Sequence, residues 1–196
     1  MTIDHIKELY YITPISNISS ILKLGILCHN KAVKLPHIDI SMNDIQERRA
    51  KKIIPNGGKL HDYANLYFDA HNPMLSRRRN QNSKICILCI SKEVLKLKDV
   101  IISDRNASSD YCRFYQSPIG LKYLDFDMIF CGYWIHNEDP YKYFEHKSIK
   151  CAEVLVPDKI DPIFISKAYV INKKVKEKLI EQEFSLDIMI KKDIFF

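Results

Sequence analysis

The string SMNDIQERRAKKIIPNGGKLHDYANLYFDAHNPML, which starts at Ser41, constrains the fold most because it places a helix, a break and a strand in close succession. Ser41 with Asp44 three residues later has the form of a capping box, so we predict a helix that begins near Met42. A proline and two glycines within residues 55–58 predict its end and a turn. The apolar and aromatic residues 65–69 predict a short strand, and the Asn-Pro pair that follows predicts a turn or a new helix.

Two adjacent arginines near the end of this predicted helix differ in their surroundings. Neighbouring helical residues point about 100° apart, so Arg48 and Arg49 cannot share one face. Arg49 falls on the side of Ile45, four residues before it. A guanidinium on the apolar side of a short helix costs stability unless an anion faces it. The pattern therefore predicts an acidic partner for Arg49.

The remainder of the chain alternates strand and helix patterns without repeats, which predicts one mixed α and β domain over residues 1–196. A helix is expected over residues 18–24, capped by Ser16 or Asn17 and ended by Gly25 at a positive φ. We expect a loop over residues 26–40 and a mobile segment over residues 136–149. Strands are predicted at 10–13, 84–91, 100–103, 151–156, 161–171 and 185–190, and a further helix at 175–183.

Composition limits the classes of function. The net charge of +6 permits a polyanionic partner. The sequence has neither a signal-peptide pattern nor an apolar run long enough to span a bilayer, and it has six cysteines. Cys86 and Cys89 lie in a predicted buried strand, on opposite sides of it, and have no second ligand pair. We therefore expect free thiols in the cytoplasm and no metal site. With five glycines and no Gly-rich phosphate motif, a Rossmann or P-loop nucleotide site is excluded.

One acidic residue stands inside an apolar strand pattern. In KCAEVLVP, residues 150–157, Glu153 shares a face with Cys151 and Leu155. A carboxylate at such a position is costly unless it is paired or functional. The alternative is an edge-strand glutamate that faces water. Pattern alone leaves both open.

Several segments, taken in order, resemble the DarT family of DNA ADP-ribosyltransferase toxins. They are LYYITPISNISSILKLGIL, DIQERR, GGKLHDY, LYF, NPML, DRNAS and KCAEVLV. The resemblance as a whole extends over about residues 9–171. The resemblance implies an α+β ADP-ribosyltransferase fold, in which a split β-sheet forms a cleft for the co-substrate NAD. It further implies transfer of ADP-ribose to a thymine or guanine of single-stranded DNA. The partner implied is a macrodomain antitoxin of the DarG type.

The resemblance also assigns roles to residues of this chain. Glu153, with Arg49 or Arg48, is implied to be catalytic. Implied contacts to NAD come from Tyr11, Thr13, Asn17, Gly25, Arg49 and Tyr67. Implied contacts to DNA come from Met74, Arg77, Arg78, Arg79 and Asn106, although three adjacent arginines also fit a solvated surface. Tyr11 and Pro14 stand where family members often have histidines, and a tyrosine hydroxyl or ring is the expected substitute.

Two other functions fit the same residues. The chain could be an inactive homologue that binds nucleic acid or NAD without transfer, because the N-terminal histidines are absent. It could also modify RNA. Retention of both arginines and Glu153 favours an active enzyme.

Overall fold

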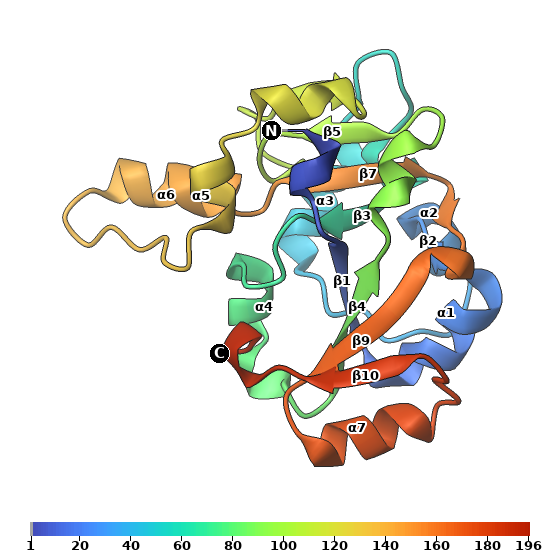
Figure 1. Ribbon diagram of the computed structural model, residues 1–196. Helices are drawn as coiled ribbons and strands as arrows, with labels where there is room; N and C mark the ends of the chain where they lie inside the picture. The colour runs from blue at the N-terminus through green and yellow to red at the C-terminus, as the bar shows by residue number, and fades with distance from the viewer. Residues whose placement is uncertain (1) are drawn as a thin grey trace.

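The strands form one large sheet and one small sheet in the computed structural model, which describes residues 2–196 (Figure 1). The large sheet has eight strands in the order β10-β9-β4-β1-β3-β7-β5-β6, and the small one pairs β2 with β8. The strands are β1 Leu9–Pro14, β2 Ile26–Leu27, β3 Tyr63–Tyr67, β4 Ile85–Ile90, β5 Ile101–Ser103, β6 Phe114–Gln116, β7 Glu153–Pro157, β8 Lys159–Ile160, β9 Ile165–Val170 and β10 Asp187–Ile190.

Helices surround the large sheet. The α-helices are α1 Ile18–Leu24, α2 His29–Ala32, α3 Asn43–Lys51, α4 Pro73–Arg77, α5 Phe126–Phe130, α6 Pro140–Ile149 and α7 Lys173–Ile180. Short 3-10 helices are η1 Ile3–His5, η2 Ile15–Asn17, η3 Leu60–Asp62, η4 Arg79–Gln81, η5 Lys92–Lys96, η6 Ile119–Tyr123, η7 Pro162–Phe164 and η8 Lys192–Ile194. In Figure 1, α5 and α6 project from the body as an arm, residues 126–150. Within residues 2–196, the structure has no helix with the length and apolar character needed to cross a bilayer.

The large sheet is split at its centre. β1 and β3 pair at one position only, Tyr10 opposite Tyr67, among the described residues. On their other sides, β1 pairs with the whole length of β4, and β3 pairs with the whole length of β7. The sheet is therefore two half-sheets that meet at one point and separate beyond it. This arrangement confirms the predicted α+β fold with a split sheet.

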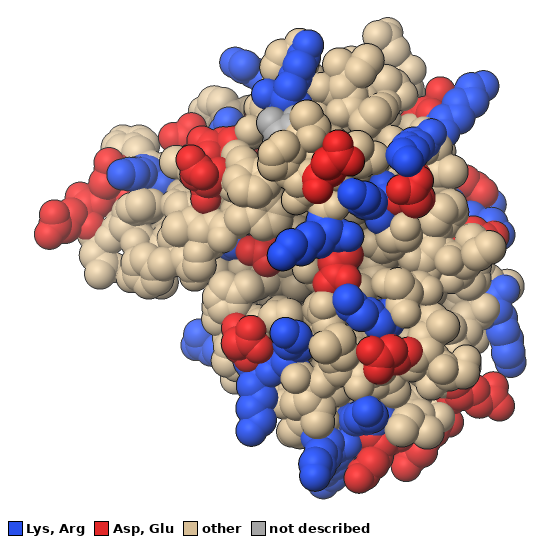
Figure 2. Space-filling model, in the orientation of Figure 1, with Lys and Arg blue, Asp and Glu red and all other residues tan. Residues whose placement is uncertain are grey.

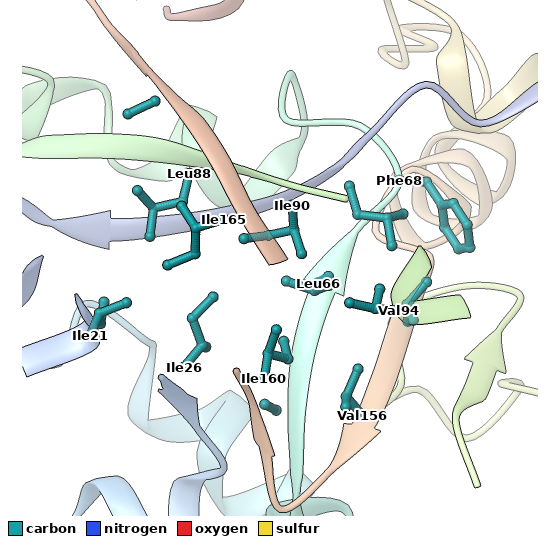
Figure 3. Close-up of a cluster of buried hydrophobic side chains, with 14 of the residues drawn as sticks. Ile21, Ile26, Leu66, Phe68, Leu88, Ile90, Val94, Val156, Ile160 and Ile165 are labelled. Carbon is teal, nitrogen blue, oxygen red and sulfur yellow. The ribbon is translucent and has the colours of Figure 1, made fainter. Parts of the chain in front are cut away.

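The core explains why β4 is apolar throughout. All six residues of ICILCI are buried, and alternate side chains join two different clusters on the two faces of the sheet. Leu88 and Ile90 meet Leu66 and Val156 in the larger cluster (Figure 3). Cys86 and Cys89 lie on opposite faces, as predicted. All six cysteines are free thiols.

Three local predictions were wrong. α3 begins at Asn43 with Met42 as its N-cap, near the predicted start, but the predicted capping box is absent. The Ser41 N–H, which Asp44 would bind in such a box, donates instead to Asp39 Oδ1 at 2.7 Å. Residues 26–40 contain β2 and α2 and are more than a loop. Residues 136–149 are largely the helix α6, whose start is fixed by Asp139 Oδ1 accepting from the Lys142 N–H at 2.9 Å and by Pro140 at N1.

Gly25 ends α1 in the predicted conformation, with φ of +89°. A Cβ placed there would lie 2.3 Å from the carbonyl oxygen of Ile160, in the strand that pairs with β2. Gly25→Ala is therefore expected to lower the free energy of unfolding by about 1–3 kcal/mol or more, measured by urea denaturation. Gly132→Ala is the matched control, because a Cβ there meets no atom within 4 Å. An equal, small effect of both substitutions would contradict this structural role.

Candidate active site

A cavity of about 1010 Å³ opens where the two half-sheets separate. One wall is β1, with Tyr11 and Thr13, and the facing wall is β3, with Tyr63, Asn65 and Tyr67. Segments after α1 and around α3, α4 and α6 complete the lining. The split sheet thus produces the cavity directly, since the two walls are the strands that stop pairing beyond Tyr10 and Tyr67.

A buried ion pair lies beside this cavity. Arg49 Nη1 donates to Glu153 Oε1 at 3.1 Å and to Oε2 at 3.0 Å. The side chains of Arg49 and Glu153 are 9% and 1% exposed, so solvent screens this charge pair little. Arg49 itself lines the cavity. Glu153 is therefore the acidic partner that the helix geometry predicted for Arg49. The two residues are 104 positions apart in the sequence.

The strand position and a neighbouring loop fix the carboxylate of Glu153. At the start of β7, Glu153 is paired with Tyr67 of β3 on one side and Ser103 of β5 on the other. The Glu153 N–H donates to Ser103 Oγ at 3.0 Å. The Ala107 N–H donates to Glu153 Oε1 at 2.9 Å. Glu153 is not among the residues that line the cavity, and Arg49 and Tyr67 connect it to the cavity.

Arg48 has a different environment from its neighbour. Its side chain is 55% exposed and pairs with Asp44 one turn earlier at 3.5 Å. It also lines the cavity, at a more exposed position than Arg49. The predicted division of the two arginines between two helix faces is thus seen in the structure, and Arg49 is the one that contacts Glu153.

The implied NAD contacts on β1 and β3 are polar groups in an apolar setting. Burial raises the pKa of Tyr11 to about 12, with Asp39 adding to the shift. Burial, with Glu153 nearby, also raises the pKa of Tyr67 well above its ordinary value. Both hydroxyls therefore stay protonated and can donate hydrogen bonds. Thr13 Oγ1 is buried and has no hydrogen-bond partner within residues 2–196.

Asn17 and Gly25 stand at the two ends of α1, as its N-cap and its C-cap. Asn17 does not cap α1 with its side chain. Its amide instead holds the backbone of Ile38, donating to the carbonyl at 2.9 Å and accepting from the N–H at 3.0 Å. Asn17 and Ile38 both line the cavity, so this contact fixes part of its rim. Gly25 does not line the cavity, and its observed role is in the backbone geometry of α1.

The residues implied to contact DNA are also divided by the structure. Met74, Arg77, Arg78 and Asn106 line the cavity, whereas Arg79 does not. Arg78 Nε donates to the Ile40 carbonyl, which ties α4 to the rim. The Asn106 side chain accepts from the N–H of Ser108 at 2.9 Å and from its hydroxyl at 2.7 Å, as expected for a turn. Asn106 thereby shapes the loop that presents the Ala107 N–H to Glu153.

A histidine pair in the cavity had no predicted role. The rings of His29 and His61 lie 4.0 Å apart between centroids, and both line the cavity. His61 Nε2 donates to Gln46 Oε1 at 2.9 Å. Burial, then His29 and Arg49, lower the pKa of His61 to about 4, so its ring is neutral at pH 7. No sequence signal joins two histidines 32 residues apart. They meet because α2, which carries His29, packs against η3, which carries His61.

Comparison with known proteins places this site in a family. A family model described as "ssDNA thymidine ADP-ribosyltransferase, DarT" matches residues 10–196. A DNA ADP-ribosyl transferase–DNA ADP-ribosyl glycohydrolase fusion protein of Thermosipho africanus is 33% identical over 88% of this chain. The chain spans 45% of that relative's length. A DNA ADP-ribosyl transferase of Thermus sp. strain 2.9 is 29% identical, and the match covers 88% of this chain and 85% of that protein.

Solved structures agree with these relatives. Thermus sp. 2.9 DarT in complex with ADP-ribosylated ssDNA has a TM-score of 0.86 and 26% identity, covering all of this chain and 99% of that one. The same protein in complex with NAD+ has a TM-score of 0.81 and 26% identity, covering 97% of this chain and 98% of that one. The family match over nearly the whole chain and the shared fold show that this chain belongs to the DarT family.

Proposed function

We propose that this chain is an NAD-dependent ADP-ribosyltransferase that modifies thymidine in single-stranded DNA. The observation that carries the proposal is the buried Arg49–Glu153 pair beside a cavity of about 1010 Å³, in a chain of the DarT family. A pocket of this size is sufficient for a ligand larger than a typical small molecule. Thymidine is chosen because it is the acceptor in the family description.

NAD fits the chemistry of the lining. We place the dinucleotide between β1 and β3, where Tyr11, Thr13 and Tyr67 offer hydroxyl groups. The unpaired Thr13 Oγ1 favours a polar ligand, since a buried hydroxyl without a partner is costly. Arg49 adds a fixed positive charge beside the pyrophosphate or the reacting ribose. Asn17 contributes to NAD binding indirectly, because its side chain fixes the cavity rim at Ile38.

The proposed reaction exchanges one C–N bond for another. The bond between ribose C1′ and nicotinamide breaks with its electron pair leaving on nicotinamide, and the ribose gains oxocarbenium character. The Glu153 carboxylate stabilises that positive charge without reorganising, because Arg49 and the Ala107 N–H already hold it. A ring nitrogen of the acceptor base then bonds to C1′ and releases its proton to solvent. Arg49 remains charged throughout and is not the proton acceptor.

Incubating the protein with NAD and a pool of single-stranded DNA and RNA oligonucleotides tests this function. Mass spectrometry is expected to find one ADP-ribose added to thymidine-containing DNA. Addition of ADP-ribose to RNA alone would identify RNA, and not DNA, as the substrate. Tight binding without any addition would identify an inactive homologue.

We further propose that the chain acts as a toxin in the cytoplasm, restrained by a macrodomain antitoxin of the DarG type. The six free thiols support a reducing compartment. The Thermosipho relative, a transferase–glycohydrolase fusion by description, supports a partner that removes ADP-ribose. Expression in bacteria is expected to arrest growth, and co-expression of such a glycohydrolase to restore it. Equal growth with the wild-type chain and with Glu153→Ala would argue against toxicity by transfer.

Arg77 and Arg79 give a matched test of DNA binding. Both side chains are exposed, but only Arg77 lines the cavity. Arg77→Ala is expected to weaken DNA binding and to lower the slope of log K against log salt by about one, as for one lost phosphate contact. Arg79→Ala should leave the slope unchanged. Fluorescence anisotropy across a salt series measures both, and identical slopes for the two variants would assign Arg77 to the plain solvated surface.

A further inference from the structure

The arm formed by α5 and α6 presents aromatic side chains to solvent at the rim of the cavity. Tyr141 is 89% exposed and Phe144 is 64% exposed, and both line the cavity. They lie three residues apart on α6 and so share one face of the helix with Glu145 and Ser148, which also line the cavity. His146 and Ile149, on another side of the helix, are buried. The exposed face is therefore the one directed to the site.

This face is held rigidly. The Asn106 N–H donates to the Ser148 carbonyl at 2.8 Å, which joins α6 to the loop that binds Glu153. At the base of the arm, Lys150 Nζ is buried, donates to the Ile129 carbonyl at 2.8 Å and pairs with Asp69. The exposure of the two rings therefore belongs to an anchored helix and does not come from a frayed one.

The basic and aromatic side chains around Tyr141 and Phe144 are suited to binding a nucleic-acid strand. Arg77, Arg78 and Lys147 line the same cavity, and α4, which carries Arg77, lies beneath the arm in Figure 1. Tyr111, 81% exposed, adds another ring to the lining. In Figure 2 the visible surface of the arm is largely uncharged, with acidic groups toward its tip. Aromatic rings beside basic groups are the combination by which proteins hold single strands, through stacking on bases and contacts to phosphates.

We propose that Tyr141 and Phe144 stack on bases that flank the modified base in single-stranded DNA. This inference rests on the proposed function and adds where the strand outside the reacting nucleotide is held. NAD is not the occupant, because the groups assigned to it on β1 and β3 are buried, as at Thr13, or partly buried, as at Tyr11 and Tyr67, whereas these rings are at the exposed rim. The arm thereby sets how much flanking DNA is needed for recognition.

The double variant Tyr141→Ala/Phe144→Ala tests this assignment. Its KM for a DNA oligonucleotide with one acceptor base is expected to rise about tenfold or more, since base stacking is lost, with kcat at saturating DNA and the Kd for NAD unchanged. Lengthening the oligonucleotide on either side of the acceptor should increase wild-type affinity but not that of the variant. Tyr141→Trp/Phe144→Tyr keeps two rings and should retain the wild-type KM.

Tyr133→Ala is the control on the same arm. Tyr133 is 60% exposed but does not line the cavity, so its removal should change neither KM nor the length dependence. A wild-type protein that transfers nothing to DNA would refute the proposed function itself. If the wild-type protein does transfer, a double variant whose KM and length dependence equal those of Tyr133→Ala would overturn this inference.

Discussion

Glu153→Gln is expected to lower the single-turnover rate of DNA modification by about two orders of magnitude or more at saturating NAD. Glutamine keeps the shape of the side chain but removes the charge that stabilises the developing oxocarbenium. Its single carbonyl oxygen also cannot replace both carboxylate oxygens, which accept from Arg49 and from the Ala107 N–H. NAD binding should change much less than the rate, because the lost interaction is strongest in the transition state.

Glu47→Gln is the control for this substitution. Glu47 is exposed on the same helix as Arg49 and does not line the cavity. Its replacement should leave the rate near the wild-type value. If Glu153→Gln retains more than about half of the wild-type rate, Glu153 has no place in the mechanism.

Removing Arg49 should have the largest effect on stability. Arg49→Met fills the same volume but leaves Glu153, 1% exposed, as a buried charge with the Ala107 N–H as its remaining donor. Breaking a buried pair in this way costs about 3–5 kcal/mol of the free energy of unfolding. Arg48→Met is the adjacent control, and its exposed pair with Asp44 should cost less than about 1 kcal/mol. Chemical denaturation of both variants measures the difference.

A double-mutant cycle separates the pair from general packing. On the Glu153→Gln background, Arg49→Met should cost much less than in the wild-type chain, because no buried charge is left unpaired. Equal costs on both backgrounds would mean that Arg49 stabilises the protein through packing of its alkyl chain.

The sequence predicted some parts of this molecule well because their causes are local. The apolar run of β4 and the glycine that ends α1 follow from short-range patterns. The need of Arg49 for an anion followed from helix geometry. That the anion is Glu153 did not follow, since 104 residues separate the two and only strand pairing brings them together.

The failures have equally specific causes. α6 was missed although Asp139 and Pro140 form a helix start, because the polar and aromatic residues after them show no apolar stripe. Half of the residues of this helix are exposed. The Ser41 capping box failed because an aspartate two residues before Ser41 takes its N–H. The Ala107 contact to Glu153 is made by the main chain and has no side-chain signature. His29 and His61 meet only through tertiary structure.

The single paired position between β1 and β3, among the residues that the structure describes, has a consequence for how this protein can vary. Among the described residues, β1 and β3 pair nowhere beyond Tyr10 and Tyr67, and both strands line the cavity. Strand edges without a partner leave backbone N–H and C=O groups available to a ligand. A ligand that hydrogen-bonds to these strand edges is recognised by backbone atoms. Every residue type carries these atoms, except that proline has no N–H. Side chains along these walls can therefore vary without removing the backbone groups that a ligand could bond. Tyr11 and Pro14, which differ from the histidines often found in the family, stand on one of these walls.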